Sequence, residues 1–173
     1  GGVTLSDGRG LKFRNCTFFD SASGLDADKV TDLEVTHSVF ARVPLRLKNA
    51  EAVALSGNIF AGSREPAIRL DAAGAIRYSD YNSYQDAAQC WEVNGAAWSF
   101  ADVQQQHDRH SRTLAPEFVL ERGVPRLEDE HPFKSVGPGS TALGIHHVYD
   151  AAPRVLVLVG PFLHSVSDTT ANV

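Results

Sequence analysis

The sequence of 173 residues contains no methionine, only two cysteines and no long hydrophobic run. Cys16 and Cys90 are too few for a disulfide framework, and their spacing is not that of metal ligands. The longest apolar run lies near Val155 to Val159 and is far shorter than the roughly 18 residues of a membrane-spanning helix. With 16 Lys and Arg against 21 Asp and Glu, the net charge is −5, and no basic cluster is present that could follow phosphates. We therefore expect no membrane insertion and no nucleic-acid partner.

The remaining composition is that of a globular protein. Hydrophobic residues make up 43% of the chain and charged residues 21%, and the length suits about one domain. The chain opens on Gly1-Gly2, followed at once by sequence typical of strands and turns, and it shows no signal peptide. These features indicate a fragment of a longer polypeptide with flanking domains.

An internal repeat runs through the first half of the chain. Its first apolar position recurs after 22, 20 and 23 residues. A second apolar position lies eight residues before the first in every copy. Apolar and polar residues alternate within each copy, as in Leu45-Arg46-Leu47-Lys48, which is typical of a half-buried strand and not of a helix. Short strands at this period bury their apolar face only when successive copies stack. We expect four inward columns: Leu11/Leu33/Val53/Ile76, Phe13/Val35/Leu55/Tyr78, Phe18/Phe40/Phe60 with Ser83 in the fourth copy, and Leu25/Leu45/Ile68/Trp91.

Each copy also contains a polar or turn-forming pair between its two apolar segments. These pairs are Asn15-Cys16, His37-Ser38, Gly57-Asn58 and Asp80-Tyr81. A leucine-rich repeat has a similar period but requires an L-x-x-L-x-L run and a single strand, which fits these copies poorly. The pattern predicts an all-β solenoid of parallel strands. In such a stack Cys16 and Cys90 are about three coils apart, too far for a disulfide, so both should be free thiols.

The chain resembles the right-handed parallel β-helix family, which includes the pectate lyases. The resemblance covers about residues 3 to 120 and is carried by phrases such as Ser56-Gly57-Asn58-Ile59-Phe60 and Ser79-Asp80-Tyr81-Asn82. It implies an extracellular or cell-surface protein that acts on or binds polysaccharide. The motifs identify the fold better than the activity.

The periodicity changes at Trp98. Ser99 and Asp102 form a capping-box-like pair, which predicts a short helix. The stretch from Trp98 to Phe118 is similar to the closing segment of bacterial β-helix proteins and should cover the end of the stack. We expect three parts in the chain: the β-helix with its closing segment at 1–120, an irregular cap or linker at 121–153, and the first strands of a fibronectin type III-like domain at 154–173, where about 14 residues match.

Candidate chemistry lies on outward positions, because the interior of a solenoid is filled. Two outward columns run along the stack: Thr4, Asp26, Arg46, Arg69, Glu92 and Ser6, Asp28, Lys48, Asp71, Asn94. A lyase of acidic glycans needs cations that neutralise a uronate carboxylate and a base that removes its α-proton. Lys48 is the candidate base, Arg46 and Arg69 are the candidate neutralisers, and Asp28 and Asp71 are candidate ligands of a bridging calcium ion.

Other interpretations of these polar residues stay open. Alternating charges on a strand face usually form a solvated ladder that is mutually screened. Asp26 and Asp28 lie about 7 Å apart by strand rise and are the only candidate carboxylate pair for a glycosidase.

The seven histidines invite a zinc hypothesis, through His107, His110 and the pair His146-His147. A structural role is the alternative for Asp108 and His110-Ser111, since such side chains commonly tie turns together by hydrogen bonds.

Two classes of function remain. In the first, the chain belongs to a carbohydrate-active enzyme, a lyase or hydrolase of acidic polysaccharide. In the second, it is a non-catalytic β-helix module for adhesion, glycan binding or spacing. The connections at 19–24, 41–44, 61–67 and 84–90 vary in length, and we expect them to project together on one side and to line any groove.

Overall fold

The computed structural model describes residues 2–19, 23–86, 89–114, 118–121, 124–127, 133, 136–137 and 143–144. Within them the chain forms a solenoid of four coils, each of which contributes one strand to each of three parallel sheets. The predicted all-β parallel solenoid is confirmed. The first sheet contains β1 (Val3–Ser6), β4 (Leu25–Asp28), β7 (Leu45–Lys48), β10 (Ile68–Leu70), β13 (Trp91–Val93) and, antiparallel at its end, β14 (Ala96–Trp98).

The other two parallel sheets complete each coil. The second sheet contains β2 (Lys12–Arg14), β5 (Glu34–Thr36), β8 (Val53–Ser56) and β11 (Ile76–Asp80), which follows a 3₁₀ turn at Ala73–Ala75. The third contains β3 (Thr17–Phe19), β6 (Val39–Ala41), β9 (Ile59–Ala61) and β12 (Ser83–Tyr84).

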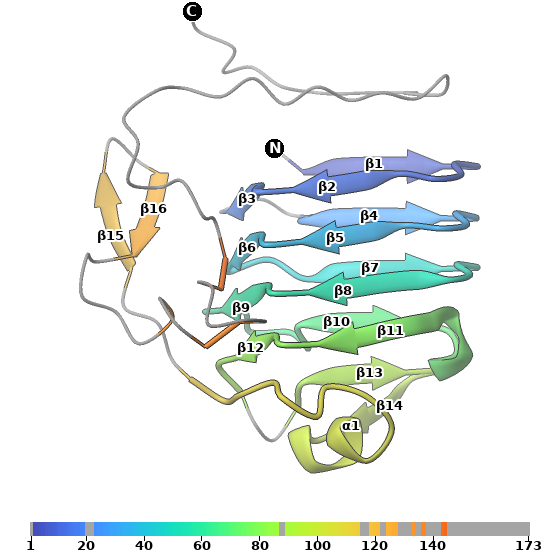
Figure 1. Ribbon diagram of the computed structural model, residues 1–173. Coiled ribbons are helices and arrows are strands. Elements are labelled where there is room, and N and C mark those ends of the chain that lie inside the picture. The colour runs from blue at the N-terminus through green and yellow to red at the C-terminus, as the bar shows by residue number, and fades with distance from the viewer. Residues whose placement is uncertain are drawn as a thin grey trace, which may run out of the picture.

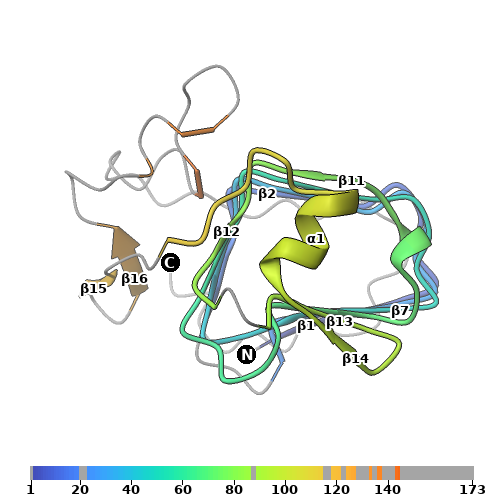
Figure 2. The same cartoon turned by 90° about the horizontal axis from the view of Figure 1, so that it is seen from below.

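The coil is right-handed. In Figure 1 the strands of the first sheet run to the right at the back, and those of the second run to the left at the front. Seen from below in Figure 2, the chain runs counterclockwise as it advances toward the viewer. This is the handedness expected from the resemblance.

The interior is filled by side chains stacked in register from coil to coil. Leu25, Leu45, Ile68 and Trp91 are paired neighbours in the first sheet and are all fully buried. In the third sheet the rings of Phe18, Phe40, Phe60 and Tyr84 are stacked, with centroid separations of 4.6, 4.8 and 5.3 Å. These separations are close to the spacing of neighbouring strands, so each coil extends the same apolar column.

The fourth coil departs from the predicted register. A β-bulge in β11 shifts the pairing between Ile76 and Tyr78, so that Ser79 pairs with Leu55. Tyr78 is consequently 46% exposed, whereas Ser79 is buried. The prediction that Tyr78 faces inward is wrong, because the extra residue of a bulge reverses the alternation beyond it.

The shift also moves the next two positions. Tyr84, not Ser83, continues the phenylalanine column, and the fourth corner pair is Tyr81-Asn82 instead of Asp80-Tyr81. Tyr81 adopts the left-handed backbone conformation at this corner, with φ of 57°. The preceding corners have the same conformation at Asn15, His37 and Gly57.

A polar ladder runs inside these corners and consists of Ser38, Asn58, Asn82 and Ser111. The backbone N–H of Ser38 donates to Asn58 Oδ1 at 3.0 Å, and that of Asn58 donates to Asn82 Oδ1 at 3.0 Å. The N–H of Asn82 donates to Ser111 Oγ at 2.7 Å. All four residues are buried, so the ladder satisfies backbone donors that turn inward at each corner.

The predicted helix covers the far end of the stack. It is α1 (Phe100–Gln106), which lies across the last coil in Figure 2. Ser99 caps it through a reciprocal pair with Asp102, as the sequence predicts, and Val103 is fully buried against the core. Among the described residues no helix is long and apolar enough to cross a membrane.

Two segments follow the helix. β15 (Phe118–Glu121) and β16 (Val124–Leu127) form an antiparallel hairpin beside the third sheet (Figure 1). The expectation of irregular structure from residue 121 is therefore wrong at β16. The predicted fibronectin type III-like strands at 154–173 lie outside the described residues.

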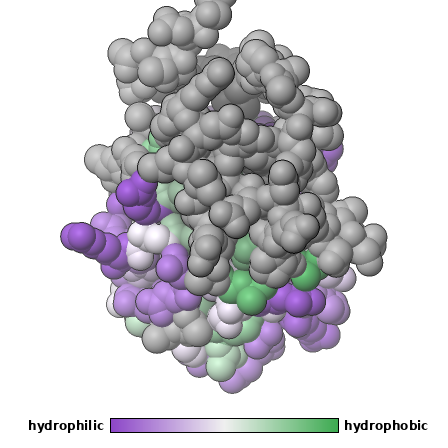
Figure 3. Space-filling view, turned by 90° about the vertical axis from the view of Figure 1, so that its left-hand side faces the viewer, coloured by the Kyte–Doolittle hydropathy of each residue, from purple (hydrophilic) through white to green (hydrophobic). Residues whose placement is uncertain are grey.

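The outer face of the third sheet is apolar and is covered by a later part of the chain. Figure 3 looks onto this side of the molecule and shows hydrophobic residues between hydrophilic flanks. Phe133 and Leu143 are almost fully buried in a cluster with outward residues of β6 and β9, among them Ile59. The N–H of Gly144 donates to the carbonyl of Gly57 at 2.7 Å, and a Cβ at Gly144 would lie 2.8 Å from Ile59 Cδ1. The sequence repeat does not predict this second cluster.

Both cysteines are free thiols, as expected. Burial raises the pKa of Cys16, and burial together with nearby carboxylates raises that of Cys90 to about 12.

Candidate functional site

The outward columns of the first sheet have the predicted register. Arg69 pairs with Arg46 across the strands, and Arg46 pairs with Asp26. Lys48 pairs with Asp28 on the neighbouring strand. The structure therefore brings the candidate catalytic residues onto one face of the solenoid.

Both candidate arginines hold carboxylate partners. Arg46 Nη1 lies 3.2 Å from Asp26 Oδ1, and Arg46 Nη2 lies 2.9 Å from Glu65 Oε2. Arg69 Nη1 lies 3.2 Å from the same oxygen of Glu65, and Arg69 Nε lies 3.6 Å from Glu92 Oε2. Burial lowers the pKa of Arg46, but the hydrogen bond that Arg46 donates to Glu65 and the charge of Asp26 outweigh this effect and raise the pKa. We call the series Asp26, Arg46, Glu65, Arg69 and Glu92 the charge ladder.

Glu65 is the member of the charge ladder that the sequence analysis misses. It lies in the connection between β9 and β10, one of the segments of variable length, and therefore has no counterpart in the repeat columns. The only signal in the sequence is its place four residues before Arg69, but this spacing favours ion pairs on a helix, and the repeat predicts no helix here.

Lys48, Asp28 and Asp71 lie at the edge of the same face. Lys48 is exposed, and among the described residues no hydrogen bond or ion pair of its ammonium group is recorded. Asn49 lies between the two aspartates: its Nδ2 donates to Asp28 Oδ1 at 2.9 Å and its backbone N–H donates to Asp71 Oδ2 at 3.0 Å. The two candidate calcium ligands thus share an amide neighbour.

A cleft opens where the variable connections lie. It has a volume of about 420 Å³ and lies between the β9–β10 and β12–β13 connections. Its walls combine apolar and polar groups: Phe60, Ala61, Gly62, Ser63, Glu65, Ala67, Gln85, Asp86 and Gln89. Gln85 Oε1 accepts a hydrogen bond from the backbone N–H of Gly62, which ties the two connections together. Two of the four variable connections, 61–67 and 84–90, therefore line a groove together, whereas no residue of 41–44 belongs to it.

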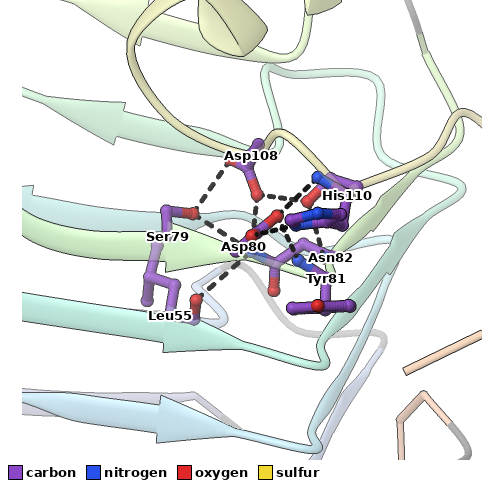
Figure 4. Close-up of polar contacts among 8 residues, drawn as sticks. Leu55, Ser79, Asp80, Tyr81, Asn82, Asp108 and His110 are labelled. Carbon is purple, nitrogen blue, oxygen red and sulfur yellow. Dashed lines mark hydrogen bonds and ion pairs between the residues drawn. The ribbon is translucent and has the colours of Figure 1, made fainter. Parts of the chain in front are cut away.

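The closing segment contributes a buried carboxylate at the end of the core (Figure 4). Asp108 is 1% exposed and accepts four side-chain hydrogen bonds. The donors are Ser79 Oγ at 2.9 Å, Asn82 Nδ2 at 2.9 Å, Tyr84 OH at 3.0 Å and Ser111 Oγ. Burial raises the pKa of Asp108 above its ordinary value, and the hydrogen bonds limit the rise.

His110 has its own carboxylate partner. Its Nδ1 lies 2.6 Å from Asp80 Oδ2, and its backbone N–H donates to Asp80 Oδ1 at 2.7 Å. Its ring stacks on Tyr81 at 4.8 Å (Figure 4). Asp108, His110 and Ser111 therefore tie the closing segment to β11 and the fourth corner, which confirms their structural role.

The zinc hypothesis gains no support from the described histidines. The ring of His107 stacks on that of Trp91 at a centroid distance of 5.5 Å, whereas His110 pairs with Asp80. Burial lowers the pKa of His107. His146 and His147 lie outside the described residues. In the described part of the chain no group of three or more His, Cys, Asp or Glu side chains is placed to hold a metal.

The two carboxylates that are candidates for a glycosidase pair have different partners. Asp26 forms an ion pair with Arg46, whereas Asp28 accepts from Asn49.

Comparison with known proteins adds no family to these observations: no family model, no curated protein and no solved structure matches this chain. The fold and the geometry of its surface are therefore the basis for assigning a function.

Proposed function

We propose that this chain is the closing part of a secreted or cell-surface β-helix protein, similar to the pectate lyases in fold, and that it binds polysaccharide without itself catalysing a reaction. The observation that carries the proposal is the cleft of about 420 Å³ between two coil connections. Ligand sites of this size are typically concave, with a few polar groups placed among apolar ones.

The groups in the cleft suit a ligand rich in hydroxyls. Gln85 and Gln89 have amide groups that both donate and accept hydrogen bonds, and Glu65 and Asp86 have carboxylates that accept them. The ring of Phe60 is 2% exposed and stacked in the core, so the apolar contact that the cleft offers a sugar comes from small side chains such as the half-buried Ala67. Repetition of coils would extend such a groove along the solenoid, which suits a chain-like ligand.

The charge ladder argues against catalysis on this part of the surface. A lyase requires cations that are available to the substrate carboxylate, but in the chain without ligand Arg46 and Arg69 both hold carboxylates of the chain itself. In that state the charges on the outer face of the first sheet screen one another.

A lyase of acidic glycans is the second candidate, and the exposed amine of Lys48 favours it. In that function Lys48 would remove the α-proton and Asp28 and Asp71 would hold calcium.

The test is a calorimetric titration of the chain with oligosaccharides. We expect Gln89→Ala to weaken binding about fivefold, the effect of one lost hydrogen bond. Gln105→Ala, an exposed glutamine of α1, is the matched control and should bind like the wild type. If Gln89→Ala bound the oligosaccharides as tightly as the wild type, the cleft would be rejected as the binding site.

The same samples decide between binding and cleavage. Incubation with uronate polysaccharides, followed by absorbance of unsaturated products, should show no turnover. Turnover that disappears in Lys48→Ala would establish the lyase instead.

A further inference from the structure

A single carboxylate oxygen bridges the two arginines of the charge ladder. Glu65 Oε2 lies 2.9 Å from Arg46 Nη2 and 3.2 Å from Arg69 Nη1. The two arginines are neighbours on adjacent parallel strands, so the rigid sheet holds their guanidinium groups at one spacing. Glu65 Oε2 is held by a charge-assisted hydrogen bond from Arg46 and by an ion pair with Arg69, as a bound carboxylate would be.

The bridging group comes from a connection and not from the sheet. Glu65 belongs to the β9–β10 connection, where its backbone N–H donates to Ser63 Oγ at 3.1 Å. Its side chain is 42% exposed, and those of Arg46 and Arg69 are 29% and 36% exposed. The bridge is therefore accessible to solvent and can exchange with another anion at small cost.

Glu65 also belongs to the wall of the cleft. A ligand in the cleft thus lies next to the residue that occupies the two arginines. A sugar carboxylate that entered from the cleft would compete with the Glu65 carboxylate for the same two guanidinium groups.

We propose that Arg46 and Arg69 form a binding site for one carboxylate of an acidic glycan, and that Glu65 fills this site as an internal substitute when the glycan is absent. The proposal rests on the proposed glycan-binding function and adds its specificity and its control. Entry of the ligand carboxylate displaces Glu65, and the charge balance of the face is kept because one carboxylate replaces another.

The expected strength of the competition follows from the exposure of the bridge. Exposed ion pairs contribute modestly to stability, and the apparent affinity of a partly blocked site falls with the fraction that is open. Removal of the internal carboxylate should therefore raise the affinity for an acidic ligand by about three- to tenfold.

The experiment compares two variants that remove the same charge from the same face. Glu65→Gln vacates the bridging position. Glu92→Gln removes a carboxylate whose single ion pair within the described residues is with Arg69, at 3.6 Å. Each variant and the wild type are titrated with an oligouronate and with the same oligosaccharide after its carboxyl groups are reduced to alcohols. Thermal unfolding checks that both variants are folded.

We expect Glu65→Gln to bind the oligouronate about three- to tenfold more tightly than the wild type, and Glu92→Gln to change it less than twofold. Glu92→Gln should leave binding of the reduced oligosaccharide within about twofold of the wild type. For Glu65→Gln, which also changes the cleft wall, the ratio of oligouronate affinity to reduced-oligosaccharide affinity should rise by the same three- to tenfold, and adding Arg69→Gln to Glu65→Gln should remove this gain. Equal gains in the two variants, or none in Glu65→Gln, would overturn the proposal, because a general charge effect or a purely structural bridge predicts those results.

A second measurement separates this proposal from the glycan function. Sodium glucuronate is titrated at constant ionic strength while the Arg Nε–H signals are followed by NMR. Shifts of the Arg46 and Arg69 signals in Glu65→Gln, with no oligosaccharide bound by any variant, would uphold the carboxylate site and reject the glycan function. Binding of the reduced oligosaccharide without such shifts would uphold the glycan function and reject the carboxylate site. If neither binding nor shifts were observed, both proposals would be rejected.

Discussion

Ser111 is the last residue of the polar ladder and accepts the hydrogen bond that Asn82 would otherwise donate to a further coil. The backbone N–H of Asn82 donates to Ser111 Oγ at 2.7 Å, as the N–H of Asn58 donates to Asn82 in the coil before. Ser111 in turn donates to Asp108. The closing segment thus satisfies the last inward donor of the stack, which would otherwise be buried without a partner.

The first prediction concerns this closure. Ser111→Ala removes the acceptor of the Asn82 N–H and one donor to Asp108, and we expect a loss of about 2 kcal/mol in the free energy of unfolding. Ser6→Ala, at an outward position of β1, should change it by less than about 0.5 kcal/mol. Urea unfolding measures both, and equal stabilities would show that Ser111 does not close the ladder.

The second prediction concerns the pH dependence of stability. The pKa of Asp108 is raised in the folded state from its ordinary value near 3.8, so folding favours the protonated form. This contribution is complete below the ordinary pKa and is lost as the pH rises through the folded pKa. Asp108→Asn does not titrate, so the difference in Tm, wild type minus variant, should fall from pH 4 to pH 7. A difference that grows over this range would contradict the direction of the shift.

The third prediction concerns the two thiols. Cys90 is 1% exposed and has a pKa of about 12, so at pH 8 only about one part in ten thousand is thiolate. Cys16 is only half-buried and should react faster with iodoacetamide in the folded chain. In denaturant both should react. Mass spectrometry of peptides gives the order, and faster labelling of Cys90 in the native state would refute the burial at the fourth coil.

The fourth prediction concerns the cover of the third sheet. Leu143→Asp places a charge where the side chain is 1% exposed and packs with Ile59, which should cost about 3 kcal/mol or release the segment. Thr113→Asp adds the same charge at an exposed position and should be nearly neutral. Thermal unfolding and light scattering compare the two, with aggregation expected for Leu143→Asp because the apolar face is uncovered.

The sequence alone determined the stack and, outside β11 and β12, the side of it on which the strand residues of the repeat columns lie. Alternation with a period of two, repeated at a constant offset of eight residues, is a local property that only parallel stacking can satisfy. It placed Leu25, Leu45 and Ile68 inside and Arg46, Lys48 and Arg69 outside, as the structure confirms. The capping pair of Ser99 and Asp102 was likewise predictable, because both partners lie within one helical turn.

The tertiary structure decided everything that lies off this period. The bulge in β11 moved Tyr78 outward and brought Ser79 to Asp108, which is 29 residues later. The partner of Arg46 and Arg69 came from a connection of variable length, which has no position in the repeat. Such contacts join residues that are distant in sequence, and their geometry depends on how much chain each coil must accommodate. A one-dimensional pattern carries the spacing of a column, but only the closed coil determines which loop carboxylate meets which arginine.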